Sequence, residues 1–454
     1  MAMCTASLAL AQNCGSGGGA TVCLSATGTP DNIQLSWTVS GSITGLQIYR
    51  DTDSNPSGRT RIAIPTSSTR SYTDSSAAVG TPYWYWVKFT VSGGASYSSG
   101  AASATRAGLM RNMTSLQLSG QMSPGWNLGN SLEAIGGETA WGNPAVNQAM
   151  FNAVKAAGFK SVRIPVSWTQ YADANYNISA SWMARVKQVV DYARTAGLYV
   201  MINVHWDGGW MQPTYAQQAS VNARLNKFWT QIGTTFKYYD DYLLFAGTNE
   251  TMVDGNYNAP TTEYCTVQKS FLKTFVDAVR ATGGNNSSRH LVVQGFNTNI
   301  DYTVGCNATL PADSVANRQM MEVHFYDPYN FTLNSSGAIW QWGAGATSAA
   351  NTETWANEAY VDAQFQKMKT NFIDKGIPVI LGEYAASSKT EFDAAGTYRK
   401  AWDQYITRAA YTRGVVPMYW DAGSTANHGS GLFNRSSATQ AYPDVISAIV
   451  NAAK

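Results

Sequence analysis

Hydrophobic and polar positions follow two different patterns on either side of about residue 106. In residues 21–106, short segments such as 33–37 and 83–89 alternate apolar and polar side chains, and turns rich in Gly, Ser, Asp and Pro separate them. Alternation with a period of two predicts strands with one buried face. Residues 21–106 are therefore expected to form a small all-β sandwich domain.

Residues 109–454 alternate near-continuous apolar runs with segments of helical period. Strands that are apolar on both faces are typical of parallel sheets covered by helices. Eight strand and helix units predict an α/β fold, a (β/α)₈ TIM barrel, for this second domain. A doubly wound open sheet is the alternative, but no Gly-x-Gly-x-x-Gly sequence follows a strand to support it. The predicted strands are residues 125–129, 161–166, 199–205, 243–249, 291–296, 320–326, 378–383 and 415–420, and the predicted helices are 150–158, 181–197, 221–236, 271–282, 360–375 and 398–413.

The first 20 residues are expected to be a truncated secretory leader followed by a linker. Ala9-Leu10-Ala11 fits the small-x-small pattern that precedes a signal-peptidase site, although no basic segment comes before it. A disordered tail is the alternative. Residues 14–20 are rich in Gly and Ser, which favours a linker.

The chain has five cysteines, whose number indicates the redox state of the compartment in which the protein works. Cys4 falls in the expected leader, and the even number that remains favours an oxidising environment, with buried free thiols as the alternative. Cys265 is expected near the start of the helix after the fourth barrel strand, and Cys306 in the loop after the fifth. These positions belong to neighbouring units, so a disulfide between them is predicted, and Cys14 with Cys23 is the second predicted pair.

Composition narrows the range of partners. Lys and Arg number 31 against 29 Asp and Glu, a net charge of +2, which argues against a nucleic-acid binder. No run of about 18 apolar residues occurs, so no membrane span is expected. The 15 Trp, 25 Tyr and 15 Phe, with few charges, suit a secreted protein that handles sugars. The sequence does not indicate an oligomeric state.

Polar residues gather where the predicted barrel strands end, which is where barrel enzymes carry their active sites. Glu250 and Glu383 end the fourth and seventh strands, on opposite sides of the same barrel mouth. Two carboxylates that face each other across a cleft are what glycosidic bond cleavage requires. A metal site is the competing interpretation, but no His-x-His or His-Glu-x-x-His spacing occurs, so no metal and no cofactor are expected. The other polar or aromatic strand-end residues are Arg163, Asn203, His205, Asn249, His324, Tyr326 and Trp420.

A set of short motifs, all in order, resembles those of glycoside hydrolase family 5. The resemblance covers residues 109–454, and WGNP at 141–144 is similar to the loop after the first strand in its cellulase-like bacterial subfamilies. Residues 21–106 resemble an immunoglobulin-like or fibronectin type III-like module, with Trp37 as the core tryptophan. The family motifs are GWNLGN at 125–130, VRIP at 162–165, NVH at 203–205, NE at 249–250, HFY at 324–326, LGEY at 381–384 and YW at 419–420.

This resemblance implies a retaining endo-β-1,4-glucanase that hydrolyses cellulose-like or mixed-linkage β-glucan. Xyloglucanase, licheninase and β-mannanase activities are the alternatives within the family, and a non-catalytic glycan-binding barrel is the alternative of another class. The implied protein is secreted. A bacterial source is favoured, because Asn249-Glu250-Thr251 is a glycosylation sequon and a glycan there would block the site.

The resemblance also implies catalytic roles. Glu250 is expected to be the general acid/base and Glu383 the nucleophile. Arg163 is expected to keep Glu383 ionised, so that the pKa of Glu383 is low, while burial and the nearby anion raise the pKa of Glu250. Tyr326 is expected to donate a hydrogen bond to Glu383. Asn249 is expected to bind the sugar 2-hydroxyl.

Three further residues complete the implied site. His324 is expected to contact and tune Glu250. His205 is expected to bind the sugar at the reacting subsite, and Trp420 to form the floor beneath it. The sequence departs from the family at Thr251, where proline is usual, and at Trp206, where close relatives often have a second histidine.

Overall fold

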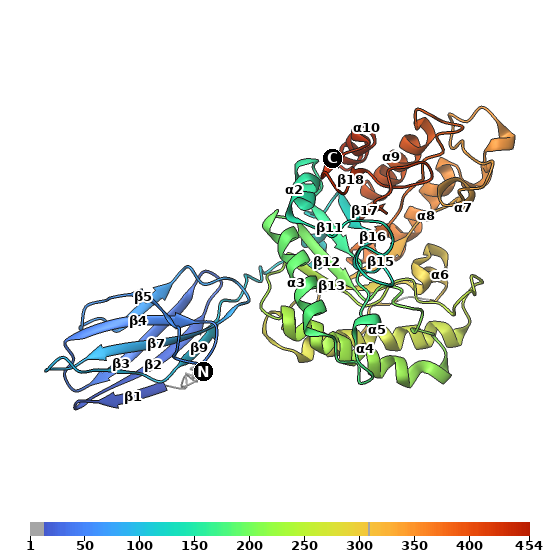
Figure 1. Cartoon of the computed structure of the whole chain (residues 1–454). Helices are drawn as coiled ribbons and strands as arrows, with labels where there is room; N and C mark the ends of the chain where they lie inside the picture. Colours follow the sequence, from blue (N-terminus) through green and yellow to red (C-terminus); the bar gives the residue numbers. More distant parts are fainter. Residues whose placement is uncertain (1–12, 307–308) are drawn as a thin grey trace. The chain divides into compact units, whose positions relative to one another are not determined.

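The computed structural model describes residues 13–306 and 309–454, so Cys4 and the rest of residues 1–12 lie outside the described part. The chain divides into two compact units (Figure 1). The first extends to Met110 and includes Phe236–Asp240, and the second contains Arg111–Thr235 and Asp241–Lys454.

The N-terminal unit is built from two antiparallel sheets, as the alternating pattern predicts. One sheet has the order β1-β2-β3-β6, and the other has the order β5-β4-β7-β8, with β9 paired to β7. Alternate residues such as Leu24, Trp37 and Val87 point into a shared core, so Trp37 is the buried tryptophan that the pattern predicts. The strands are β1 (Asn13–Gly17), β2 (Ala20–Gly28), β3 (Ile33–Ser40), β4 (Gly45–Asp51), β5 (Thr60–Ala63), β6 (Ser71–Asp74), β7 (Pro82–Thr90), β8 (Ser96–Ser98) and β9 (Ala102–Thr105).

The prediction of a linker over residues 14–20 is wrong, because most of this stretch is strand β1. It pairs antiparallel with β2, and the pair of residues Gly18 and Gly19 between the strands has φ values of +60° and +80°. Glycine adopts such left-handed conformations at little cost, which permits the tight hairpin. Cys14 lies directly opposite Cys23, and the predicted disulfide between them is confirmed. Backbone pairing and the crosslink therefore define this strand, which has no apolar pattern.

The second unit is a closed barrel of eight parallel strands, which confirms the predicted fold (Figure 1). Each strand pairs with the next in sequence, and the first pairs with the last. All eight predicted strands are present. They are β10 (Gly125–Leu128), β11 (Ser161–Ile164), β12 (Tyr199–Asn203), β13 (Leu243–Ala246), β14 (Leu291–Gln294), β15 (Gln319–His324), β16 (Val379–Glu383) and β17 (Val415–Asp421), and a small hairpin follows with β18 (Phe433–Asn434) and β19 (Thr439–Gln440).

Helices follow the barrel strands, and all six predicted helices are present. Several begin earlier than predicted, because polar N-caps extend them: α5 begins at Thr262, where the side chain of Thr261 accepts the backbone N–H of Tyr264. Within the described part of the chain, no helix is both long and apolar enough to cross a bilayer. The α-helices are α1 (Ser115–Ser119), α2 (Gln148–Ala156), α3 (Ala180–Thr195), α4 (Tyr215–Phe236), α5 (Thr262–Ala281), α6 (Ile300–Gly305), α7 (Tyr329–Thr332), α8 (Glu358–Asn371), α9 (Thr397–Tyr411) and α10 (Pro443–Ala452). The 3₁₀ helices are η1 (Thr169–Tyr171), η2 (Gly284–Ser287), η3 (Phe296–Thr298), η4 (Ala349–Asn351), η5 (Thr354–Ala356) and η6 (Ile373–Lys375).

The barrel interior changes from apolar to polar along the strands. Met201, Val292 and Met320 belong to a buried apolar cluster in the barrel. Two and four residues beyond Met320, on the same face of β15, lie Glu322 and His324. The apolar layers therefore support a polar layer at the C-terminal ends of the strands.

The predicted disulfide between Cys265, in α5, and Cys306, after α6, is confirmed, with 5.5 Å between the Cα atoms. It closes a loop of 41 residues. Loop-closure entropy predicts a contribution of about 4 kcal/mol to the stability of the barrel.

We predict that replacing Cys265 and Cys306 together by serine lowers the melting temperature of the barrel, because the unfolded chain gains that entropy. Calorimetry of the full chain measures the change. The double serine variant of Cys14 and Cys23 is the comparison, because it opens a loop of only 9 residues, worth about 3 kcal/mol in the same treatment, in the other unit. Unchanged melting of the barrel after loss of Cys265 and Cys306 contradicts the prediction.

Candidate active site

Arg163, on β11, is the centre of the polar layer and is fully buried. Its Nη1 donates to Oε1 of Glu383 at 2.8 Å and to Oδ1 of Asn127 at 3.1 Å. Nη2 donates to Oδ1 of Asn249 at 2.6 Å, and Nε forms an ion pair with Oε1 of Glu322 at 2.9 Å. Five separate segments of the barrel thus meet at one guanidinium.

Asn127, on β10, orients this guanidinium. Its Nδ2 donates to the backbone oxygens of Gly382, Met418 and Tyr419, on β16 and β17. The amide therefore turns its Oδ1 toward Arg163. One side chain thus links the closing strands of the barrel to the charged centre.

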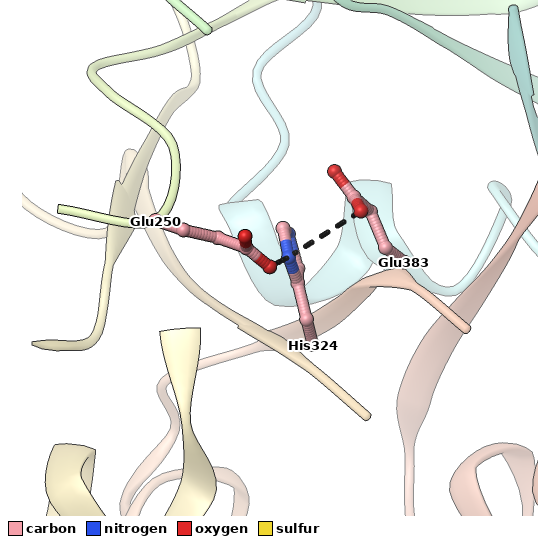
Figure 2. Close-up of side chains that lie close together, drawn as sticks. All are labelled: Glu250, His324 and Glu383. Carbon is pink, nitrogen blue, oxygen red and sulfur yellow. Dashed lines mark hydrogen bonds and ion pairs between the residues drawn. The ribbon is translucent and has the colours of Figure 1, made fainter. Parts of the chain in front are cut away.

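Glu250, His324 and Glu383 converge at the barrel mouth (Figure 2). Nδ1 of His324 lies 2.7 Å from Oε1 of Glu250 and 3.7 Å from Oε2 of Glu383. One oxygen of each carboxylate and this nitrogen all lie within 4.8 Å of one another. Carboxylates about 5–5.5 Å apart are typical of retaining glycosidases, whereas inverting enzymes separate theirs by about 6.5–9.5 Å. The geometry matches the retaining class.

The other oxygen contacts fix Glu383 in place. The hydroxyl of Tyr326 donates to Oε2 of Glu383 at 2.9 Å, while Arg163 holds Oε1. The side chain of Glu383 is 7% exposed, whereas that of Glu250 is 40% exposed. Glu383 is therefore rigidly held in the floor of the site, and Glu250 faces the open cleft.

The three converging side chains also meet the distance criterion for a metal site. Burial lowers the pKa of His324, but the charge of Glu383 and the hydrogen bonds to Glu250 and Glu322 outweigh it and raise the pKa to about 9. An imidazole must be neutral to bind a metal. Because His324 holds a proton at neutral pH and the Arg163 cation lies alongside, this set of side chains fits a proton better than a metal ion.

The expected order of the two carboxyl pKa values is wrong for the free site. Burial raises the pKa of Glu250, but the hydrogen bond to His324, with the charges of His324 and Arg163, outweighs it, and the pKa is lowered. Burial raises the pKa of Glu383, and the negative charge of Glu250 raises it further. The positive charges of His324 and Arg163 lower it but do not outweigh these effects, so the pKa is raised. The sequence-based expectation assigned Arg163 the main role, whereas the closest cation to Glu250 is His324.

His205 and Trp420 form one wall of the site. Their rings are 5.8 Å apart and nearly parallel, with an interplanar angle of 8°. Burial and the charges of Arg163 and His324 lower the pKa of His205 far below its usual value, so this imidazole is neutral. Its Nδ1 lies 3.2 Å from the amide nitrogen of Asn203, which leaves Nε2 as the N–H donor.

A pocket beside Glu250 contains both departures from the family motifs. Trp206 is 51% exposed there, and Thr251 is buried beneath the pocket wall, with its hydroxyl unpartnered among the described residues. The pocket is lined by His205, Trp206, Gly209, Met211, Gln212, Asn249, Glu250, Thr251, Met252 and Asp254. It does not include Glu383, so it lies on the Glu250 side of the two carboxylates.

The structure brings together the eight residues to which the sequence analysis gave a role, around Arg163, the carboxylate pair and the wall of His205 and Trp420. It adds Asn127, Glu322 and Gln294, which the sequence analysis missed. Asn127 lies within the GWNLGN motif, and Glu322 shares a strand face with His324 by the period of two. Glu322 was missed because only the last residues of each predicted strand were considered, and it lies two positions before His324.

Comparison with known families supports this geometry. The family model described as cellulase, glycosyl hydrolase family 5, matches residues 127–426. The chain belongs to glycosyl hydrolase family 5.

This family 5 hydrolase is 42% identical over 363 residues to endoglucanase A of Paenibacillus barcinonensis, which covers 75% of the chain and 90% of that relative. It is 41% identical to a xyloglucan-specific endo-β-1,4-glucanase of Bacteroides ovatus, over 72% of the chain and 68% of that relative. Among solved structures, a family 5 xyloglucanase from Paenibacillus pabuli, solved with a ligand, has a TM-score of 0.72 and 43% identity, and the match covers 74% of this chain and 100% of that one.

We predict that two histidines of the family 5 hydrolase titrate at opposite extremes. His324 is expected to lose its proton near pH 9. Burial and the positive charge of Arg318 lower the pKa of His290 to about 3, so this imidazole is expected to stay neutral. Nitrogen-15 NMR of histidine-labelled protein measures both, because the chain has only 4 histidines.

The proton on His324 makes the stability of the folded protein depend on pH. The folded pKa of His324 lies above the unfolded value of about 6.5, so its stabilising contribution is complete below about pH 6.5 and is lost as the pH rises through about 9. A His324 titration near pH 6.5 contradicts the assignment of a buried imidazolium.

Proposed function

We propose that this endo-β-1,4-glucanase cleaves its glucan backbone by two successive displacements, with Glu383 as the nucleophile and Glu250 as the general acid/base. The observation that carries the proposal is the approach of the two carboxylates to within 4.8 Å across the barrel mouth. The intact charged cluster also argues against a non-catalytic glycan-binding barrel.

In the first step, an oxygen of Glu383 bonds to the anomeric carbon while the glycosidic bond breaks, and the leaving oxygen takes a proton from Glu250. In the second step, a water molecule gives a proton to Glu250 and bonds to the same carbon, which releases Glu383. Arg163 and Tyr326 each hold one oxygen of Glu383 and so fix the plane of the attacking carboxylate. Two inversions at one carbon leave its configuration unchanged.

The proton for the first step is available on the pair of Glu250 and His324. In the free site it resides on His324, 2.7 Å from the acid. Bound sugar replaces water around the exposed face of Glu250, and loss of water favours the neutral forms of an ion pair. Transfer of the proton from Nδ1 to Oε1 then turns imidazolium and carboxylate into imidazole and carboxylic acid.

Asn249 is placed to recognise the reacting sugar. Its Oδ1 accepts a hydrogen bond from Arg163, so its Nδ2 is left to donate to a sugar 2-hydroxyl. The neutral imidazole of His205 offers its Nε2–H in the same way, and the Trp420 ring offers an apolar face to the sugar. These groups define the subsite on the Glu383 side.

Linear β-1,4-glucan is the first candidate substrate, and branched xyloglucan is the second. The second candidate is supported by two solved family 5 xyloglucanases, which match this chain with TM-scores of 0.72. Reducing-end assays on linear cellulose derivatives, mixed-linkage glucan, xyloglucan and mannan compare the candidates directly. Turnover of mannan alone would overturn the glucanase assignment.

We propose that the enzyme is secreted and that its N-terminal sandwich is an immunoglobulin-like or fibronectin type III-like spacer. Two disulfides support an oxidising compartment. Trp86 is only 3% exposed, and the Arg59 guanidinium lies over its ring. Its ring is therefore not available to stack on a sugar, which favours a spacer over a glycan-binding module.

We predict that Glu383→Ala and Glu250→Ala respond differently to azide. Glu383→Ala is expected to lower kcat by about 10⁴-fold or more, because the nucleophile is gone. With an activated aryl cellobioside, azide then attacks directly and gives the α-glycosyl azide. Glu250→Ala keeps the nucleophile, so azide intercepts the glycosyl-enzyme and gives the β-glycosyl azide. Proton NMR of the products decides, and exchanged product configurations mean that the two roles are reversed.

We predict that Trp206→Ala raises KM for polymeric glucan about fivefold with little change in kcat, since an aromatic contact of this kind contributes about 1 kcal/mol. The exposed ring lies beside Glu250, on the side where the departing sugar must lie. Trp206→Phe keeps an aromatic face and is the matched control, with KM close to that of the parent enzyme. Equal KM values for all three proteins would show that this pocket does not bind the leaving sugar.

A further inference from the structure

A third carboxylate, Glu322, lies directly beneath the catalytic pair and has no part in the two steps above. It is fully buried on β15. Its Oε1 forms an ion pair with Nε of Arg163 at 2.9 Å and lies 3.3 Å from Nε2 of His324. Its Oε2 accepts a hydrogen bond from Gln294 at 2.5 Å. A buried charge with this many partners is held in one position.

Neighbouring strands are built around this carboxylate. Gly382 precedes the nucleophile on β16, and a Cβ at this position would lie 2.0 Å from Oε1 of Glu322. Gln294 in turn accepts hydrogen bonds from the backbone N–H and the hydroxyl of Thr248, two residues before Glu250. The carboxylate therefore packs against the strand that carries Glu383 and is linked through Gln294 to the segment that carries Glu250.

His324 lies between Glu322 and Glu250. Its Nδ1 faces Glu250 at 2.7 Å, and its Nε2 faces Glu322. The hydrogen bond that one ring nitrogen makes decides which nitrogen keeps the proton when the imidazole is neutral. A carboxylate at Nε2 keeps the proton there, so Nδ1 is the nitrogen that exchanges a proton with Glu250.

We propose that Glu322 is a positioning residue: it holds Nε2–H of His324, so that Nδ1 of the ring supplies and recovers the proton of Glu250. This inference rests on the proposed role of Glu250 as the general acid. Glu322 acts through His324 and touches no substrate.

Loss of the Glu322 carboxylate is expected to disturb His324 more than Arg163. Arg163 has three other hydrogen-bond partners, Asn127, Asn249 and Glu383, and keeps its orientation without Glu322. For Nε2 of His324, Glu322 is the hydrogen-bond partner in the described part of the chain. Loss of the carboxylate therefore frees the imidazole first.

Several titratable or charged groups surround His324 and bear on its titration. They are Glu322 and Tyr326 on its own chain segment, Glu250 after β13, Glu383 on β16, Arg163 on β11 and His205 after β12. Burial raises the pKa of Glu322, but Arg163 and His324 outweigh it and lower the pKa, so Glu322 is an anion at neutral pH. Neutralising it removes one of the three negative charges that stabilise the imidazolium.

The test compares two leaving groups in the full-length enzyme. Glu322→Gln keeps the shape of the side chain and removes its charge. With a poor leaving group, such as an alkyl cellobioside or glucan itself, kcat/KM is expected to fall about tenfold to a hundredfold, by analogy with the loss of the hydrogen-bond partner of a metal-binding histidine. With 2,4-dinitrophenyl cellobioside, whose departure needs no proton, kcat/KM is expected to change less than about threefold. Equal losses on both substrates overturn the proposal.

A second measurement needs only folded protein. In Glu322→Gln, the NMR titration of His324 is expected to move down by about one pH unit or more, because a charged hydrogen-bond partner is lost. An unchanged titration overturns the proposal. If Glu322→Gln does not fold, Gln294→Met serves instead, because it keeps the charge of Glu322 and removes the hydrogen bond that fixes the carboxylate. The same leaving-group signature, a larger loss of kcat/KM with the poor leaving group than with 2,4-dinitrophenyl cellobioside, is then expected with a smaller loss. Equal effects on both substrates in that variant also overturn the proposal.

Two controls separate the possible failures. Asp403→Asn removes a buried carboxylate from the ion pair with Arg399, in α9, and is expected to lower the melting temperature without any dependence on the leaving group. Glu250→Ala tests the proposed function on the same two substrates. If it shows the leaving-group signature while Glu322→Gln does not, the role of Glu322 alone fails. If Glu250→Ala does not show it, the role of the acid fails as well.

Discussion

The site depends on one fully buried guanidinium. A charge in the barrel interior is tolerated only where it is paired and its hydrogen bonds are satisfied. Arg163 is paired with two carboxylates and donates hydrogen bonds to two amides, from four other segments, and each of these groups is in turn oriented by its contact with Arg163. The strands cannot shift relative to one another without breaking these contacts. The arginine thus connects the register of the barrel to the geometry of its chemistry.

The fold was predictable because the barrel strands are short apolar runs buried on both faces. Runs such as 161–166 and 415–420 have no alternating pattern, and only a parallel sheet covered by helices accounts for eight of them. Helix starts were less predictable, since α5 begins with a polar turn fixed by the Thr261 cap. Strand β1 was missed for a related reason: its position comes from backbone pairing and the Cys14–Cys23 crosslink, and neither has an apolar pattern.

The convergence of Glu250 and Glu383 at the barrel mouth was predictable from the sequence, and the position of the proton was not. Strand ends and short motifs selected Glu250 and Glu383 correctly as neighbours across the mouth. Their protonation depends on which cation is closest to which oxygen, a matter of about one ångström that no spacing in the sequence records. His324 lies closer to Glu250 than to Glu383, and this difference reverses the order expected from Arg163 alone.

The missing side chain at Gly382 has an evolutionary consequence. A methyl group there would overlap the carboxylate of Glu322, although the two positions are 60 residues apart in sequence. A descendant of this chain can therefore acquire alanine at position 382 only after position 322 has shortened. A lineage that keeps glutamate at 322 keeps glycine next to Glu383. Packing alone therefore sets the order in which these two positions can be substituted.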